Sequence, residues 1–392
     1  MAQSQKTAGR LLRWLSIGLV FAAALEFSAR VDDRLAYGAP FFSRYDPDVL
    51  REVGADHVPR NVPHARFEKW RINSLGFRGP ETPREKPRGV RRIVCLGQSE
   101  TFGLYEAEGG EWPARLARKI AEAAPGFEVL NASVVGTSRS SRMAYLESDV
   151  LPLGPDLVVL LINPLNETTP GSSDPDAGPV ADEPAPSPLS WARLRVVEKL
   201  KLRLKEALPE SWVEAAEAWR VRRSLREIER RELRGRRPLD RVPPAVVESY
   251  EAYLRRLVQF LRARGVQPIA TTYPTWVHER DLEAHRSIVS PKRTWHIDFS
   301  EEGIVDVTAK LNQATRRVAR ELAVPLADLD AAVPGSSRYF ADQYHYTDAG
   351  AEAVAQCVFR ALQAAGALEP GWTGATPLRA DGGEAAGAGG GG

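Results

Sequence analysis

The chain has 392 residues, of which 43% are hydrophobic and 27% charged, so it can form one large globular domain or two smaller ones with a sizeable core. Its 53 Lys and Arg residues nearly balance its 51 Asp and Glu residues, which gives no general reason to expect nucleic acid or another polyanion as a partner. The two cysteines, Cys95 and Cys357, stand in apolar contexts and indicate core residues, which excludes a disulfide framework and a cysteine metal site.

The amino terminus carries a basic segment followed by an apolar run over residues 14–25, which Glu26 and Arg30 close. Even counted from Leu11, this run is shorter than the ~20 residues that span a bilayer comfortably, so a cleaved signal peptide and an uncleaved anchor both stay open. We favour an anchor within residues 1–30, with the basic end in the cytoplasm and everything after it outside. Secretion after cleavage is the alternative.

Two further segments lack the pattern of a folded domain. Residues 31–89 are rich in Pro, Arg and aromatic residues without sustained periodicity, which indicates a stalk or an irregular segment packed on the main domain. The Gly- and Ala-rich tail, residues 371–392, has too few apolar residues to order itself and is expected to be disordered. The main domain is therefore predicted over residues 90–370.

Within the main domain, apolar runs of strand length alternate with helix-like stretches. The strand-like runs are residues 92–96, 128–132, 156–162, 268–273 and 324–328. The helix-like stretches are residues 111–124, 138–150, 246–263, 304–322 and 348–364. Such alternation predicts an α/β fold in which helices cover both faces of a mainly parallel sheet.

An insertion at about residues 168–242 interrupts this alternation, and it is expected to be a lid or an elaboration of the sheet. It begins with a Pro- and Asp-rich loop and continues as a charged helical region, with sixteen Lys and Arg against nine Asp and Glu from Arg193 to Arg241. A solvated helix face with i,i+4 ion pairs is the simpler interpretation. A site for anionic lipid or polysaccharide is the other.

Ser99 follows the first strand-like run in a loop that Gly97 and Gly103 allow to bend tightly. A weak oxygen nucleophile needs such a turn, because the turn exposes the hydroxyl beside a base. A serine in this position also fits an ordinary turn or helix cap. The local sequence alone leaves both interpretations open.

A candidate base lies far along the chain, where Asp342 precedes His345 by three residues. This spacing lets one turn present both side chains, so that the carboxylate fixes the imidazole tautomer and leaves the other ring nitrogen to accept a proton. Thr347 or Asp348 is expected to cap the helix that follows. A buried histidine bonded to a carboxylate for structural reasons is the alternative.

Four sequence blocks follow one another along the chain, at residues 97–103, 131–136, 155–160 with Asn166-Glu167, and 342–345. In this order they resemble the four blocks of GDSL-type (SGNH) hydrolases. The resemblance covers about residues 91–364 apart from the insertion. It implies a three-layer, flavodoxin-like, open sheet of five mainly parallel strands, and substrates that are esters of lipids, carbohydrates or small alcohols.

By the same resemblance, Ser99 would be the nucleophile and His345 with Asp342 would complete a catalytic triad. The Ser99 amide, Gly136 and Asn166 would form the oxyanion hole. The loop is not the Gly-x-Ser-x-Gly elbow of α/β-hydrolases, because a threonine stands where that motif needs its second glycine.

Two residues depart from the family pattern. Gln98 stands where many members have Asp or Gly, and Pro164 stands where the third block usually has Gly. Because proline fixes φ and donates no amide hydrogen, the loop that carries Asn166 is free to follow a different path. Neither departure removes a triad residue.

These observations predict a serine hydrolase of the membrane-anchored bacterial type, acting on ester bonds through an acyl-enzyme. Its expected partners are an ester substrate and the membrane, with the catalytic domain on the periplasmic or extracellular side, and no nucleic acid. No cofactor or metal is expected, since the histidines have no ligand spacing and the phosphate-binding glycine motifs are absent from the sequence. An O-acyltransferase on cell-envelope polysaccharide and a non-catalytic envelope binding module are the alternatives.

Overall fold

The computed structural model describes residues 2–37, 41, 50–168, 194–369 and 372. The Pro- and Asp-rich loop of the insertion and the expected disordered tail, apart from Trp372, lie outside the described residues.

The core is a sheet of five parallel strands in the order β6-β5-β7-β8-β9. The strands are β5 (Arg91–Leu96), β6 (Phe127–Asn131), β7 (Leu157–Leu160), β8 (Gln267–Thr271) and β9 (Leu326–Ala327). Cys95 of β5 lies opposite Asn131 of β6 on one side and Val159 of β7 on the other, so these three strands end at the same edge of the sheet. Counted along the chain, the order is the 2-1-3-4-5 of flavodoxin-like sheets, which confirms the predicted fold class.

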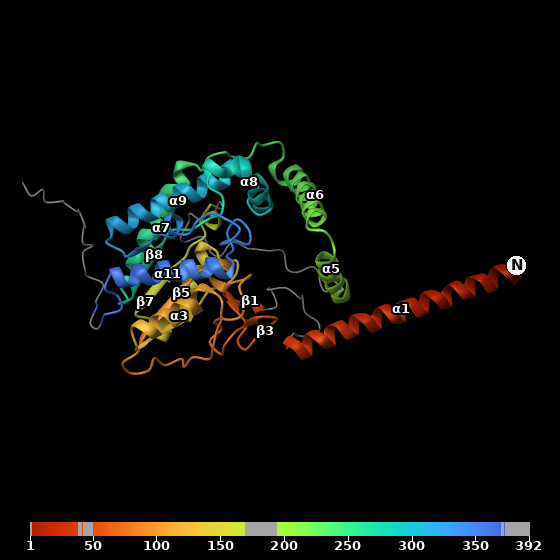
Figure 1. Ribbon diagram of the computed structural model, residues 1–392, viewed down its shortest axis with the longest axis horizontal. Coiled ribbons are helices and arrows are strands. Elements are labelled where there is room, and N and C mark those ends of the chain that lie inside the picture. Colours follow the sequence, from red (N-terminus) through yellow and green to blue (C-terminus); the bar gives the residue numbers. More distant parts are fainter. Residues whose placement is uncertain (1, 38–40, 42–49, 169–193, 370–371, 373–392) are drawn as a thin grey trace, which may run out of the picture.

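Helices cover both faces of this sheet (Figure 1). On one face α3 (Trp112–Ala123) packs against α11 (Asp348–Ala364), and on the other α7 (Pro244–Arg262) packs against α9 (Glu301–Glu321). Leu116 and Ile120 of α3, one turn apart, are fully buried against the sheet. The Thr347 hydroxyl accepts the Gly350 amide and caps α11, as predicted. The shorter helices are α2 (Ser99–Phe102), α4 (Arg139–Tyr145), α8 (Leu282–Val289) and α10 (Leu329–Ala332).

The amino-terminal helix α1 (Ala2–Tyr37) projects from the rest of the molecule (Figure 1). Within its stretch from Arg13 to Ala36, an 18-residue window has a mean hydropathy of 1.5, and the stretch is long and apolar enough for a membrane span or a signal sequence. The helix does not end at Arg30, where the predicted segment ended. Charged residues close the apolar run, but they do not stop the helix.

Residues 50–89 hold two short antiparallel strand pairs. One pair is β1 (Arg51–Val53) with β2 (Pro59–Asn61), and the other is β3 (Arg66–Phe67) with β4 (Trp70–Arg71). Phe67 and Trp70 pack in a small apolar cluster with Phe102 of α2. The segment therefore supports the helix that begins at Ser99.

In its described part, the insertion consists of α5 (Arg195–Ala207) and α6 (Glu210–Ile228), followed by a π-helical turn over residues 229–233. Helix α5 packs on α1, and α6 packs on the 3-10 helix η8 (Ser290–Thr294). The insertion thus links the amino-terminal helix to the side of the domain that carries η8.

Candidate active site

Ser99 is the first residue of α2, directly after the central strand β5. A Cβ atom at Gly97 would lie 2.0 Å from Oγ1 of Thr101 and 3.1 Å from the Leu161 carbonyl, so only glycine fits this turn. Gly103 ends α2 with φ of 84°, which L-residues rarely adopt. From β5 the chain continues to β6 on one side and then returns to β7 on the other side of β5, so the strand order reverses at β5. Open parallel sheets bind ligands at such a reversal. The sequence therefore presents the Ser99 hydroxyl at the usual ligand-binding edge.

The structure brings Ser99, His345 and Asp342 into one hydrogen-bonded chain. Nε2 of His345 lies 2.9 Å from Oγ of Ser99, and Nδ1 lies 2.8 Å from Oδ2 of Asp342. The other carboxylate oxygen, Oδ1, accepts the backbone amides of Tyr344 and His345 at 2.9 and 3.0 Å. Oδ1 is thereby held by backbone donors, and Oδ2 points at the imidazole. This geometry allows proton transfer from the serine hydroxyl to Nε2.

Lys292 is a further charged partner of Asp342 that the sequence did not reveal. Its Nζ atom donates to Oδ2 of Asp342 at 2.8 Å and lies 5.0 Å above the Tyr344 ring. Burial alone would raise the pKa of Asp342, but the hydrogen bonds and charges of His345 and Lys292 hold it well below its usual range. The carboxylate therefore stays ionised while it orients the imidazole.

We expect Lys292→Met to move the acid limb of the kcat/KM pH profile upward by about one pH unit. The ammonium opposes a second positive charge on the imidazole–carboxylate pair, so its loss makes protonation of that pair easier. Hydrolysis of an aryl acetate between pH 4 and pH 9 measures this limb, and Lys292→Arg, which keeps the charge, is the matched control. An unchanged limb in Lys292→Met would contradict the electrostatic role.

Gln98 ties together the two loops that flank Ser99. Its Nε2 donates a hydrogen bond to the Thr137 carbonyl in the loop after β6. Its Oε1 accepts a hydrogen bond of 2.6 Å from Nδ2 of Asn166, which lies in the loop after β7. Gly136, in the loop after β6, has φ of 73°, and a Cβ there would lie 2.6 Å from a guanidinium nitrogen of Arg51. An amide nitrogen carries two hydrogens, so the bond to Gln98 uses one of the two on Asn166. The departure at Gln98 thus has a structural role.

Pro164 is accommodated as the first residue of the 3-10 helix η4 (Pro164–Glu167). At this position the missing amide hydrogen would have no intrahelical partner. Asn163 caps the helix by accepting the Leu165 amide at 3.0 Å, and its Nδ2 donates to the buried Glu100 at 2.8 Å. The departure at Pro164 therefore starts a short helix that carries Asn166.

Glu106 is a buried carboxyl group near His345. It is 1% exposed, its Oε2 accepts the Tyr105 amide at 3.1 Å, and its buried Oε1 has no hydrogen-bond partner in the described part of the chain. The Tyr105 ring packs on the His345 ring with centroids 5.2 Å apart. Burial raises the pKa of Glu106 to about 7, against the lowering effect of Arg78 and the Tyr105 amide.

We expect Glu106→Gln to stabilise the protein more at pH 8 than at pH 5, by roughly 2 kcal/mol. The pKa of Glu106 is about 7 in the folded state, against an ordinary 4.5. As pH rises between these values, the unfolded chain loses the proton while the folded chain keeps it, so the carboxyl group lowers the free energy of unfolding. Urea unfolding at both pH values measures the difference, with the exposed Glu85→Gln as control. Equal changes at the two pH values would contradict the assignment.

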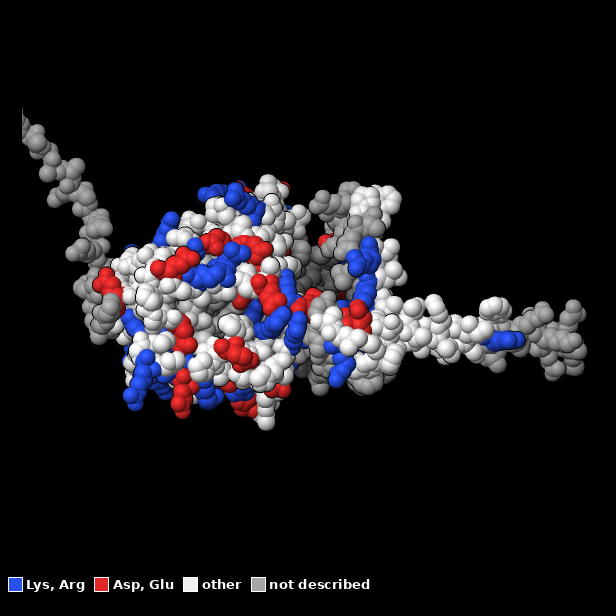
Figure 2. Space-filling model, turned by 60° about the horizontal axis from the view of Figure 1, so that its bottom comes forward, with Lys and Arg blue, Asp and Glu red and all other residues white. Residues whose placement is uncertain are grey.

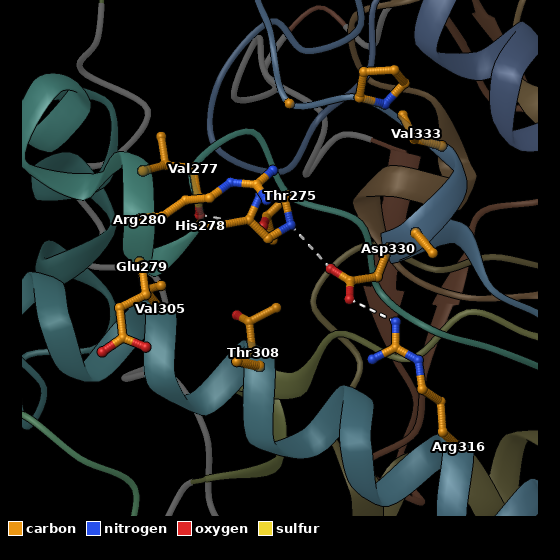
Figure 3. Close-up of a pocket in the computed structure, with 14 residues that line it drawn as sticks. Thr275, Val277, His278, Glu279, Arg280, Val305, Thr308, Arg316, Asp330 and Val333 are labelled. Carbon is orange, nitrogen blue, oxygen red and sulfur yellow. Dashed lines mark hydrogen bonds and ion pairs between the residues drawn. The ribbon is translucent and has the colours of Figure 1, made fainter.

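A separate cavity of about 730 Å³ lies between α9 and the loops that follow β8 and β9 (Figure 3). Nε2 of His278 and a guanidinium nitrogen of Arg316 bind the two carboxylate oxygens of Asp330 at 3.2 and 2.8 Å. Gln343, from the loop that carries Asp342 and His345, bonds to both backbone groups of Val277 in the cavity wall. His278, Arg316 and Asp330 thus satisfy one another. Within the described ranges, no group of three or more His, Cys, Asp or Glu side chains could hold a metal ion.

Comparison with known proteins gives one family match. The model of the GDSL-like Lipase/Acylhydrolase family matches residues 95–353, more than half of the chain. No curated protein matches.

Solved structures with a similar arrangement include three hydrolases. The lipase/acylhydrolase from Enterococcus faecalis is 16% identical, with a TM-score of 0.40 over 70% of this chain and 96% of that one. An acetyl xylan esterase from Geobacillus stearothermophilus is 15% identical, with a TM-score of 0.40 over 69% and 94%. An alpha/beta hydrolase enzyme from the metagenome of Lake Arreo, Spain, is 16% identical, with a TM-score of 0.41 over 70% and 95%. Identities this low carry no substrate over to this chain.

Proposed function

Because the chain belongs to the GDSL-like lipase/acylhydrolase family and is an ester-hydrolysing enzyme, we propose that it works through an acyl-enzyme on Ser99. The observation that supports this proposal is the chain of hydrogen bonds from Ser99 through His345 to Asp342. Ser99 and His345 are only half-buried, so an ester can reach them. Lys292 and the two backbone amides hold the carboxylate that orients the imidazole.

The reaction follows from these contacts in two halves. Oγ of Ser99 attacks the ester carbonyl as Nε2 of His345 takes its proton, and the same proton then passes to the leaving alcohol. Water attacks the acyl-enzyme in the second half, with His345 again as base. Asp342 stays ionised throughout and stabilises the imidazolium that forms in each half.

The proposed oxyanion hole consists of the backbone amides of Ser99 and Gly136 and the Asn166 side chain. Gly136 supports this assignment because its left-handed backbone and the nearby Arg51 guanidinium require a residue without a side chain. Asn166 supports it because Gln98 orients its carboxamide through only one of the two amide hydrogens. Donors placed in advance stabilise the charge that develops on the carbonyl oxygen.

Asn166→Ala is expected to lower kcat by about 100-fold, with KM changed much less, because one donor to the developing oxyanion is lost. Steady-state hydrolysis of an aryl acetate measures both constants. Thr168→Ala, at the end of the same 3-10 helix, is the matched control and should keep kcat within a factor of about two. If Asn166→Ala keeps kcat within threefold of the wild type, Asn166 does not belong to the oxyanion hole.

The test of the function is covalent trapping followed by a substrate panel. A fluorophosphonate probe should add to Ser99, and peptide mass spectrometry locates the modified residue. Aryl esters of increasing chain length and acetylated oligosaccharides then separate lipase-like activity from carbohydrate deacetylation. A mass gain on an added oligosaccharide acceptor would reveal acyl transfer. No labelling and no turnover of any ester would refute the proposal and favour a non-catalytic binding module.

The proposal also places the catalytic domain outside the cytoplasmic membrane of a bacterium, held by α1. The apolar side chains of this helix are exposed, as Leu19 at 73%, Val20 at 68% and Phe21 at 65% illustrate. Basic residues precede this stretch, and such residues stay on the cytoplasmic side. Amino-terminal sequencing of the mature protein distinguishes an anchor, which keeps α1, from a secreted form that has lost it.

A further inference from the structure

Helix α5 carries an exposed row of apolar side chains, which we call the apolar stripe. Its members are Val197, Leu200 and Leu204 on the helix and Leu208 directly after it, with exposures of 38%, 59%, 51% and 45%. At about 100° of rotation per residue, the three helical positions fall within about 60° of the helix circumference. Such a stripe belongs on a helix that buries one face, but no described residue covers it. Among the described residues, the stripe is therefore an apolar surface open to a partner.

The position of α5 indicates which partner this is. Arg195 and Lys199, on the side of α5 opposite the stripe, form ion pairs with Asp33 and, for Lys199, also Asp32. The carboxylate of Glu26 accepts the backbone amide near the start of α5 at 3.0 Å. Helix α5 is thus fixed to α1 immediately beyond the apolar run that ends before Glu26.

The stripe lies on the side of α5 that does not contact α1. Arg195 and Lys199 reach toward Asp32 and Asp33 of α1, so the opposite side of α5, which carries the stripe, points away from that helix. Figure 1 shows α5 and α6 along the edge of the molecule from which α1 projects. In Figure 2, white side chains and blue Lys and Arg side chains lie together beside the base of α1.

Helix α6 adds residue types that are typical of a membrane interface. Trp212 is 69% exposed and Trp219 is 54% exposed, and the guanidinium group of Arg223 lies 5.4 Å from the Trp219 ring centroid. Tryptophan concentrates at the headgroup level of bilayers, and basic side chains are attracted to anionic lipids. The exposed basic residues of α6 are Arg220, Arg222, Arg223 and Arg226.

We propose that α5 and α6, the α5–α6 arm, lie on the surface of an anionic phospholipid bilayer, with the apolar stripe in the headgroup and acyl-chain boundary. The arm is a second membrane contact beside α1, and it goes beyond the proposed ester hydrolysis. It also reaches the active site, because Glu229 at its far end pairs with Arg293 of η8 at 2.7 Å, next to Lys292. Two contacts fix the height and tilt of the Ser99 edge above the membrane, whereas one helix would leave the domain free to rotate.

The test uses the full-length chain in nanodiscs of equimolar phosphatidylcholine and phosphatidylglycerol. A nitroxide is attached through Leu204→Cys in a Cys357→Ala background, and its collisions with oxygen, which dissolves in lipid, and with a water-soluble nickel chelate are measured. Leu19→Cys on α1 supplies the lipid reference, and the exposed Lys310→Cys on α9 supplies the water reference.

The expected oxygen-to-nickel collision ratio at position 204 is at least about threefold above that at position 310 and approaches that at position 19. A ratio equal to that at position 310 overturns the proposal. Low accessibility to both reagents overturns it too, because another part of this chain or a second copy would then cover the stripe. A lower ratio in nanodiscs of phosphatidylcholine alone supports the choice of anionic lipid.

A second variant keeps the test independent of folding and of catalysis. Leu200→Glu places a carboxylate in the stripe, and it should lower the ratio at position 204 to the water reference while the ratio at position 19 stays unchanged. Turnover of an aryl acetate in detergent should equal that of the parent, since no described side chain of α5 contacts Ser99, His345 or Asp342. The collision ratio at position 204 tests the membrane contact, and an unchanged ratio in Leu200→Glu would refute that contact. Turnover tests the proposed reaction separately.

Discussion

Ser99→Ala is expected to lower kcat for ester hydrolysis by at least about 10⁴-fold. The reason is the single chain of contacts in which Ser99 Oγ faces Nε2 of His345 at 2.9 Å. Without the hydroxyl there is no atom to carry the acyl group. The remaining amide donors still bind the substrate, so KM should change much less than kcat.

The measurement is steady-state hydrolysis of an aryl acetate, combined with the fluorophosphonate labelling described above. Ser337→Ala, in the exposed loop before Asp342 and His345, is the matched control and should keep full activity. The melting temperature of Ser99→Ala should stay within a few degrees of the wild type, because among the described residues the hydroxyl forms a side-chain hydrogen bond with His345 alone. Full turnover by the folded Ser99→Ala variant would remove Ser99 from the mechanism.

The strand and helix pattern was predictable because hydrophobic periodicity is local in the sequence. The run at residues 92–96 became β5, and the stretch at 348–364 became α11. The ends were harder to predict, as β9 shows. It covers only Leu326–Ala327, because Pro325 has no amide to donate and Asp328 instead caps α10 through the Ala331 amide.

The candidate triad could be proposed from sequence because its members stand in ordered blocks, whereas their charged environment could not. Lys292 contacts Asp342 because the fold brings η8 next to the loop that carries Asp342, and no sequence motif marks Lys292. Glu106 follows Tyr105 in an unremarkable loop, and its burial depends on packing from several elements. Such contacts between distant segments have no local signature.

The bridge made by Gln98 is an intermediate case. The sequence marked it as a departure from the family pattern, yet its two partners lie in separate loops. A position that breaks a local rule often serves a site, and here it orients Asn166. The charged residues of α1 were also only partly informative. Glu26 and Arg30 mark the end of the apolar run, but they form an i,i+4 ion pair at 2.6 Å that supports the helix beyond it.

Asp342→Asn should lower kcat by about 10⁴-fold, nearly as much as loss of the nucleophile, with little change in KM. The carboxylate accepts four hydrogens, two from backbone amides at Oδ1 and two from His345 and Lys292 at Oδ2. An asparagine has only one oxygen to replace these two acceptors. If its oxygen meets the backbone amides, its NH₂ group must face both the Lys292 ammonium and Nδ1 of His345.

In that orientation the amide donates to Nδ1, which leaves the imidazole proton on Nε2, where it cannot accept the Ser99 proton. Nitrogen NMR of the ring measures the tautomer directly, and kinetics at neutral pH measure kcat. Adding Lys292→Met to Asp342→Asn relieves the repulsion of the NH₂ group and should restore stability but not activity, because the tautomer stays wrong. A recovery of kcat in this double variant, or a loss below about tenfold in Asp342→Asn alone, would show that the carboxylate does not control the tautomer of His345.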